Sequence, residues 1–282
     1  AGNSSGSACV EGKIDQLRIF HKELSATEVS TLYAETAATV ESLDPLSEDT
    51  TDTLQVLGDT SCIATYRFEN DEVDLSGNYN GTGTGIQYAA GRYGQAASFN
   101  GSSSYVDITG FPNFSSTGLS ISAWVYSDSF ASVNTIVNLY GNNSIVWYID
   151  GSGNMVRSGQ GTAITSTSTV ATGSWQHCVM TVDTTGFLTY YINGSAAGSG
   201  NSTTSIFNDN NSSDLIGAYM GSPSGFFPGK IDQVRIFNKE ISASEVTTLY
   251  NENPLVASYR FEGNANDDMR TYDGTATNVT YE

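Results

Sequence analysis

Residues 229–252 read GKIDQVRIFNKEISASEVTTLYNE, and residues 12–35 read GKIDQLRIFHKELSATEVSTLYAE. The two stretches align without a gap, and 18 of the 24 positions are identical. A self-match this close indicates internal repetition, which has to be interpreted before any other feature of the fold. The exchanged pairs are mild: Leu17 for Val234, His21 for Asn238, Leu24 for Ile241, Thr27 for Ser244, Ser30 for Thr247 and Ala34 for Asn251.

Each copy predicts a strand followed by a short helix. From Ile231 to Phe237, β-branched and aromatic residues mix with polar ones, which is typical of a partly buried strand. Ser242 and Glu245 have the spacing of a capping box, so a helix should begin there and end before Pro254. Alternation along the strand predicts one face with Asp232, Val234 and Ile236 and another with Ile231, Gln233, Arg235 and Phe237.

A second repeat surrounds the first. Residues 63–88 align without a gap to residues 256–281, with eleven identities. The chain therefore contains an ending segment, a starting segment, a long middle, and then a second ending and a second starting segment. We interpret this order as the tail of one domain, one whole domain and the head of a third. The predicted parts are the C-terminal end of a preceding repeat (1–36), an acidic linker (37–60), a complete domain (61–252) and the start of a following repeat (253–282).

Composition narrows both the fold and the partners. The chain of 282 residues carries 29 Gly, 16 Tyr and 12 Phe, and helical patterns are almost confined to the two capped segments, which favours an all-β fold. A net charge of −19 with only 11 basic residues argues against a surface that binds nucleic acid. It also argues against binding to anionic membranes. No apolar run is long enough to predict a membrane span, and residues 1–12 do not resemble a signal peptide.

The middle of the chain reads as a succession of short strands. Leu119–Tyr126 alternates well, with Leu119, Ile121, Ala123 and Val125 on one face. Asp150-Gly151 and Asn193-Gly194 are tight-turn pairs. Roughly a dozen strands of this kind predict two packed antiparallel sheets.

The ordered segments of residues 61–252 carry a family resemblance: YRFEND, DLSGNYNGT, GRYGQAASFNGSSSYVDI, LSISAWVYSD, WQHCVMTVD, LTYYINGS and GKIDQVRIFNKEISASEVTTLY. Together they resemble a laminin-G-like domain of the concanavalin A-like lectin/glucanase jelly roll. The resemblance implies an all-β, two-sheet antiparallel jelly-roll β-sandwich with one short C-terminal helix, plus partial flanking repeats. It also implies that the first and last strands lie side by side.

We expect no catalytic residues. Glucanases of this superfold use an E-x-D-x-x-E strand motif, whereas Glu69 to Asp74 gives only E-x-D-x-x-D at the end of a strand. The second copy, from Glu262 to Asp267, loses the middle acid as well. His177 has no evident triad partners and is interpreted as a structural histidine.

Calcium is the metal that the resemblance implies, because related jelly rolls hold a structural ion near the joined first and last strands. The candidate ligands are Asp232 on the last strand and Glu69, Asp71 and Asp74 after the first strand. An alternative interpretation leaves calcium out: Asp74 organises an Asx turn and Asp232 only accepts hydrogen bonds from backbone amides.

Loop aromatics provide the chemistry that sugars require, since a ring stacks on the apolar face of a sugar and amides bind its hydroxyls. The candidate glycan-binding residues are Tyr140, Asn142, Trp147, Tyr219 and Phe226. The alternative interpretation of each is strand or core packing. Among the three cysteines, Cys178 should be a buried free thiol, and Cys9 and Cys62 are a hypothetical disulfide pair.

Three functions remain open. The first is a non-catalytic carbohydrate-binding, adhesion or structural module of a repetitive fibre, either extracellular or on a virion surface. Its partners would be a glycan or cell-surface polysaccharide, together with neighbouring repeats or subunits of the fibre. The second is a purely architectural spacer or decoration domain without a ligand, and the third is an accessory domain of a larger glycoside hydrolase.

The two half-repeats suggest one further hypothesis. In the family fold, the segments at 12–35 and 256–281 would be neighbours in one sheet. The head strand of one chain could therefore pair with the tail strand of another by β-augmentation.

Overall fold

The chain divides into two units, which are described separately: unit 1 is residues 1–47 with 253–282, and unit 2 is residues 48–252. The computed structural model describes residues 13–14, 17–19, 24, 26, 29–30, 33, 54, 56–108, 110–140, 144–159, 161–202, 214–219, 224–252, 257–259, 261, 263–266, 274–277 and 279–280. Within these residues, no helix has the length and apolar character needed to cross a membrane.

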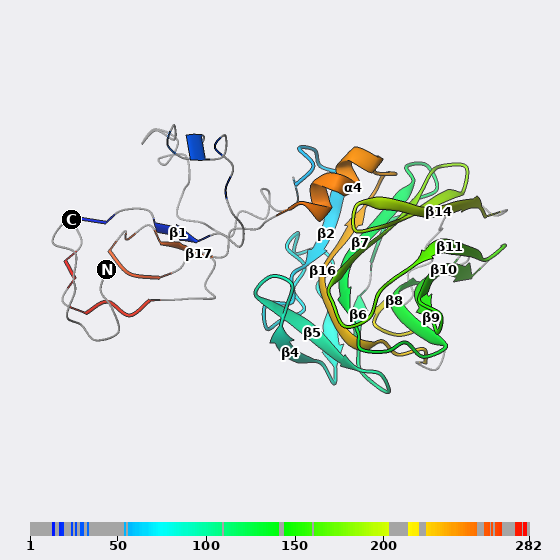
Figure 1. Cartoon of the computed structure of the whole chain (residues 1–282), viewed down its shortest axis with the longest axis horizontal. Coiled ribbons are helices and arrows are strands. Elements are labelled where there is room, and N and C mark those ends of the chain that lie inside the picture. Colours follow the sequence, from blue (N-terminus) through cyan, green and yellow to red (C-terminus); the bar gives the residue numbers. More distant parts are fainter. Residues whose placement is uncertain are drawn as a thin grey trace. The chain divides into compact units, whose positions relative to one another are not determined.

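Unit 2 is a sandwich of two antiparallel sheets, as expected (Figure 1). One sheet has the order β11-β10-β9-β8-β15-β6-β3, formed by Ile164–Thr169, Asn154–Gly159, Ile145–Asp150, Val133–Leu139, Asp214–Ile216, Tyr105–Ile108 and Thr82–Thr84. The other has the order β14-β13-β12-β7-β16-β5-β4, formed by Ser195–Asn201, Phe187–Ile192, Gln176–Val182, Leu119–Tyr126, Pro228–Phe237, Gln95–Asn100 and Gln87–Ala90. The first strand of the domain, β2 (Cys62–Tyr66), pairs with the last, β16. The adjacency that the resemblance implied is therefore present.

The main hydrophobic core lies between the two sheets. The alternating residues of β7 supply it as predicted, since Leu119, Ile121, Ala123 and Val125 are all buried there. Trp147 on β9 is the largest of the fully buried side chains and belongs to the same core. Trp175 lies outside this core: it is half-buried, and its ring lies beside that of Tyr126.

A bulge in β16 corrects the predicted faces of that strand. Gln233 has a positive φ of 49°, and the pairing of β16 with β7 shifts register between Asp232 and Arg235. Ile231 therefore joins Val234 and Ile236 in the core. Asp232 and Arg235 instead pair with Trp124 and Ser122, which lie on the outer face of β7. Strict alternation failed here because the extra residue of a bulge reverses the side-chain order.

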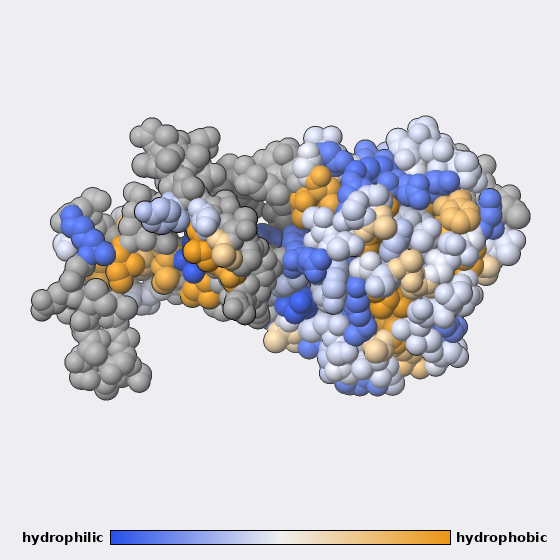
Figure 2. All heavy atoms as spheres, turned by 45° about the horizontal axis from the view of Figure 1, so that its top comes forward, coloured by the Kyte–Doolittle hydropathy of each residue, from blue (hydrophilic) through white to orange (hydrophobic). Residues whose placement is uncertain are grey.

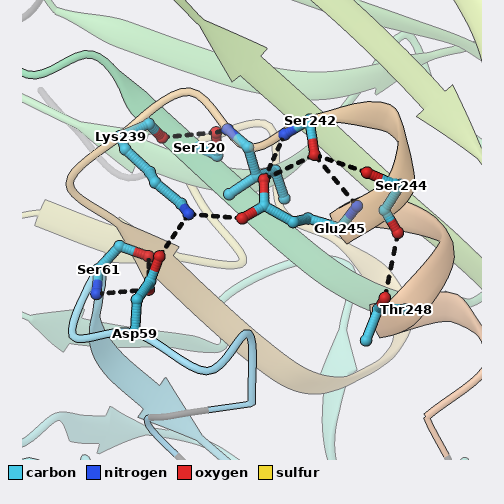
Figure 3. Close-up of polar contacts among 9 residues, drawn as sticks. Asp59, Ser61, Ser120, Lys239, Ser242, Ser244, Glu245 and Thr248 are labelled. Carbon is cyan, nitrogen blue, oxygen red and sulfur yellow. Dashed lines mark hydrogen bonds and ion pairs between the residues drawn. The ribbon is translucent and has the colours of Figure 1, made fainter.

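Helix α4 (Ala243–Tyr250) packs on the outer face of the larger sheet. It begins with the predicted capping box: the Glu245 amide donates to Ser242 Oγ at 3.3 Å, and the Ser242 amide donates to Glu245 Oε2 at 2.7 Å. Lys239 Nζ reaches both Glu245 and Asp59, so the segment before the first strand is joined to the helix N-terminus (Figure 3). A second apolar cluster lies beneath the helix and includes Cys62, Val179, Tyr191, Phe237, Ile241, Val246 and Leu249, with Leu54, Val56 and Leu57 packed against it.

The thiols in unit 2 are free. Cys62 and Cys178 are both buried and unbridged, so the suggested Cys9–Cys62 disulfide is wrong for this structure. Cys62 lies under α4, where its Sγ is 3.4 Å from Thr65 Oγ1. Burial raises the pKa of both thiols. Cys9 itself lies outside the described residues.

Unit 1 brings the two half-repeats together. Strand β1 (Leu17–Ile19) pairs antiparallel with β17 (Ala257–Tyr259), from the other end of the chain. The predicted neighbours are therefore paired, here within one chain and not between two. Ala26, Val29, Ser30 and Tyr33 are helical, as the repeat of α4 predicts.

Candidate functional site

A pocket of about 350 Å³ opens in unit 2 where three loops meet. Its lining residues come from the β5–β6 turn, the approach to β8 and the segment between β15 and β16: Gly101, Ala131, Ser132, Val133, Tyr219, Ser224, Gly225 and Phe226. Two of the five predicted glycan residues, Tyr219 and Phe226, are among them. No lining residue carries a charge, so the pocket suits a neutral ligand.

Backbone and amide bonds hold the three loops in place. Asn134 is completely buried and fixes Ala131 from both sides, since its Oδ1 accepts the Ala131 amide and its Nδ2 donates to the Ala131 carbonyl, each at 2.8 Å. Tyr219 and Ser224 exchange two backbone hydrogen bonds at 2.8 and 3.2 Å. The Gly101 amide donates to the Phe227 carbonyl at 3.1 Å. These bonds tie the described lining segments to one another and to the strands beside them.

The adjacent residues Phe226 and Phe227 lie in different places, one at the pocket and the other in the core. Phe227 is fully buried, and its ring meets that of Phe99 edge to face at 6.4 Å. Phe226, the residue before it, is half-buried and lines the pocket. Tyr219 is 41% exposed.

At Gly225 the backbone lies close to the side chain of Val133, another lining residue. It has a φ of 56°, and a Cβ at this position would lie 2.8 Å from Val133 Cγ1. A side chain there would press on the pocket wall.

The remaining predicted glycan residues lie elsewhere. Tyr140 is 39% exposed at the end of β8, and its amide donates to Asp214 Oδ1 at 2.6 Å. Trp147 is in the core, so its ring does not reach the surface. Asn142 lies outside the described residues. Ala131, Val133 and Gly225 were missed, because small residues carry no chemical signal and only the meeting of the loops gives them a role.

Two of the four predicted calcium ligands meet at the turn Gly91–Gln95. Asp232 Oδ2 accepts the amides of Arg92 and Tyr93 at 2.8 and 3.0 Å, and Glu69 Oε2 accepts the Gln95 amide at 3.0 Å. Burial, with the nearby Glu69 charge, raises the pKa of Asp232 to about 8, and burial also raises the pKa of Glu69.

The other two predicted ligands act differently. Asp74 is buried and accepts from the Thr65 and Tyr79 amides at 2.8 and 3.2 Å and from Ser76. Asp71 is exposed and accepts the Val73 amide at 3.2 Å.

In the described part of unit 2, Asp232 Oδ1 has no hydrogen-bond partner, which leaves one buried acceptor for a cation. The described residues nevertheless contain no group of three or more His, Cys, Asp or Glu side chains that could hold a metal, and calcium usually takes six to eight oxygens.

A Ser–His pair lies under α4 and was not predicted. His177 Nε2 is 2.8 Å from Ser122 Oγ, but His177 is only 1% exposed, and Nδ1 has no partner within the described residues. Burial lowers the pKa of His177 to about 3, so the ring is neutral. Without an orienting acid or access to a substrate, the pair does not form a triad.

Comparison with known proteins agrees with this architecture. None of the curated proteins matches the chain by sequence. Domain 4 of AbnA, a GH43 extracellular arabinanase from Geobacillus stearothermophilus solved in complex with arabinotriose, superposes with a TM-score of 0.56. It is 28% identical, and the match covers 68% of this chain and 98% of that one.

Two toxin domains share the fold at lower identity. The binding domain of Paraclostridial Mosquitocidal Protein 1 is 23% identical with a TM-score of 0.57, and the botulinum neurotoxin serotype D binding domain is 18% identical with a TM-score of 0.53. The matches cover 68% and 67% of this chain but only 52% and 51% of those chains.

A family model matches residues 100–247, which is just over half of the chain. The matched residues run from the end of β5 into α4 and so include the pocket as well as most of both sheets. The chain belongs to the concanavalin A-like lectin/glucanases superfamily.

Proposed function

We propose that unit 2 is a non-catalytic carbohydrate-binding module whose ligand enters the pocket between Tyr219, Phe226 and Val133. The observation that carries the proposal is the pocket itself: two aromatic side chains, small residues and serine hydroxyls line about 350 Å³ without a charge. That volume falls within the range of small-ligand sites. Partly exposed aromatic residues beside hydroxyls and backbone groups suit a neutral sugar.

The domain similarity supports a sugar as the ligand class. The arabinanase domain was solved with arabinotriose, and the match covers nearly all of that domain. An arabino-oligosaccharide is therefore the first ligand to test. The same similarity supports an accessory domain of a larger glycoside hydrolase as a second candidate. Our first candidate remains an adhesion or structural module of an extracellular or virion fibre, in which repeated weak sites add up through avidity.

The test is calorimetric titration of the whole chain with arabinotriose, together with a glycan array. Tyr219→Ala should weaken binding by roughly two- to tenfold, because stacking on an aromatic ring contributes about 0.5–1.5 kcal/mol. Phe187→Ala is the matched control, since Phe187 is also 41% exposed but lies on β13, outside the pocket. Equal losses of affinity in both variants would contradict the placement of the sugar site in this pocket, and the absence of binding to any glycan would favour the architectural spacer.

A further inference from the structure

The strand pair of unit 1 reproduces the closing pair of unit 2 in register. In unit 2, Val234, Arg235 and Ile236 lie opposite Tyr66, Thr65 and Ala64. In unit 1, the counterparts from the repeat alignment lie opposite one another in the same way: Leu17 with Tyr259, Arg18 with Ser258 and Ile19 with Ala257. Unit 1 therefore contains the first and last strands of a sandwich in their native pairing.

Local structure beyond the strands is repeated as well. Phe68 and Phe261 share a φ of 58°, and each carbonyl accepts the amide two residues on, at 3.0 and 2.9 Å. The Gly274 amide donates to the Ala265 carbonyl at 2.8 Å, as Gly81 does to Glu72. In the helical part, Ser30 Oγ donates to the Ala26 carbonyl at 2.8 Å, as Thr247 Oγ1 does to Ala243 at 2.9 Å. At these described positions, both half-repeats thus have the local conformation of their counterparts in unit 2.

The surroundings differ sharply. Ile14, Leu17, Ile19 and Val29 are 45–51% exposed, whereas their counterparts Ile231, Val234, Ile236 and Val246 are completely buried. Figure 2 shows hydrophobic side chains of unit 1 at its surface, while the visible face of unit 2 is mostly neutral to hydrophilic. A sheet that presents such side chains to water has an uncovered core face.

Unit 2 shows what covers this face. Ile231, Val234 and Ile236 pack into the core with side chains of β5, β7, β8 and β12, among them Ala97, Ile121, Val125, Val137 and Met180. All of these lie in residues 89–228, the stretch that separates the two repeats. Unit 1 has no counterpart of that stretch in this sequence.

We propose that the apolar face of unit 1 is a docking surface for the middle strands of another sandwich of the same superfamily, equivalent to residues 89–228. The β1–β17 pair closes that sandwich as its first and last strands. The occupant is thus a strand set of this fold that does not include a closing pair of its own. Recognition combines burial of the β1 face with main-chain pairing of β1 to a strand equivalent to β7.

The experiment adds the missing strands to the full chain, as a second copy of residues 90–228 linked after Glu282. Completion of the fold should add a second cooperative thermal transition and slow amide exchange at Arg18 and Ile19 by at least tenfold. Leu17→Asp with Ile19→Asp should remove the second transition and leave that of unit 2 unchanged. An unstructured appended segment with unchanged exchange at Arg18 and Ile19 would overturn the proposal.

A disulfide provides a second measurement if the extended chain is only marginally stable. In unit 2, Arg235 lies opposite Ser122. Cysteines replacing Arg18 and the Ser122 of the appended copy should therefore oxidise to a bridge, whereas cysteines replacing Arg18 and the exposed Thr185 of the appended copy should not. Equal bridging in the two pairs contradicts the placement. Protection of Ile19 that rises with the concentration of the unextended chain would make a second copy the occupant, and would also contradict it.

Discussion

The segments 12–35 and 229–252 have nearly the same sequence and differ in what surrounds them. In unit 2 the segment forms the ten-residue strand β16 and the eight-residue helix α4, and its apolar residues are buried. In unit 1 the described strand has three residues, and its apolar side chains are about half exposed. Strand, helix and pairing register thus follow from local sequence, whereas burial depends on the strands between the repeats.

The largest expected effect tests whether burial separates the two copies. Ile236→Ala should lower the free energy of unfolding of unit 2 by about 2–5 kcal/mol, because it leaves a cavity at a completely buried position. The matched change Ile19→Ala, at a position 47% exposed, should cost at most about 0.5 kcal/mol. Urea unfolding of both variants measures the difference. Similar losses would show that β1 is as well covered as β16.

The next prediction concerns Asp232, the aspartate of the GKIDQ segment in unit 2, which is completely buried. Burial raises the pKa of Asp232 to about 8 in the folded protein, well above the ordinary range of an aspartate. A raised carboxyl pKa means that the fold favours the protonated form. The contribution of Asp232 to stability is therefore complete below pH 4 and is lost as the pH rises toward 8 and beyond.

Asp232→Asn removes this pH dependence while keeping an acceptor for the Arg92 and Tyr93 amides. At pH 8.5 the variant should be more stable than the parent by on the order of a few kcal/mol, since each pKa unit corresponds to about 1.4 kcal/mol. At pH 4 the two should be nearly equal. Thermal melts across this range measure the effect, and parallel pH profiles of the two proteins would contradict the prediction.

Bound calcium would reverse the expected stability difference between the parent and Asp232→Asn at high pH. If the ion binds between Asp232 Oδ1 and Glu69, it favours the ionised carboxylates and lowers both pKa values. Calcium should then raise the melting temperature of the parent at pH 8, a chelator should reverse the shift, and Asp232→Asn should not respond. An unchanged midpoint in the parent would count against a structural ion.

Sequence reasoning was most successful where burial and alternation agree. The bounds of Leu119–Tyr126 were predicted as observed, because this strand alternates without a bulge. The strands Asn154–Gly159, Ile164–Thr169 and Ser195–Asn201 were missed, since they are rich in Ser, Thr and Gly and carry little apolar signal. The bulge at Gln233 could not be predicted, because it depends on how β16 meets β7.

The candidate site was predicted only in part, and for a physical reason. Tyr219 and Phe226 were identified from ring chemistry, but so was Trp147, which the core buries. A ring favours the core and a ligand platform equally well, so composition cannot separate these roles. The difference lies in the tertiary surroundings: on either side of Phe226, the Phe227 ring packs on Phe99 of β5 and the Gly225 carbonyl accepts the amide of Thr135 on β8, and neither contact can be predicted from the local sequence.

A smaller effect concerns the exchange of Val234 for Leu17. Val234→Leu adds one methylene at a completely buried position and should cost about 1–3 kcal/mol if the core cannot adjust. The reverse change, Leu17→Val, removes a methylene from a half-exposed position and should be close to neutral. Urea unfolding of both variants measures the two costs. A cost below about 0.5 kcal/mol for Val234→Leu would mean that either copy can close the same core.

The smallest effect tests the helix that both copies encode. Ser242→Ala removes the hydroxyl that accepts the Glu245 amide at the N-terminus of α4, and should cost about 1 kcal/mol. Ser242→Gly should cost only about a few tenths of a kcal/mol, because glycine is itself tolerated as an N-cap residue. Ser244→Ala, two residues inside the cap, removes only a hydroxyl that lies 3.0 Å from Ser242 Oγ and should be close to neutral, since alanine is the better helix former. Thermal melts that rank the three variants in any other order would show that Lys239 and the apolar cluster under α4, and not the cap, hold the helix in place.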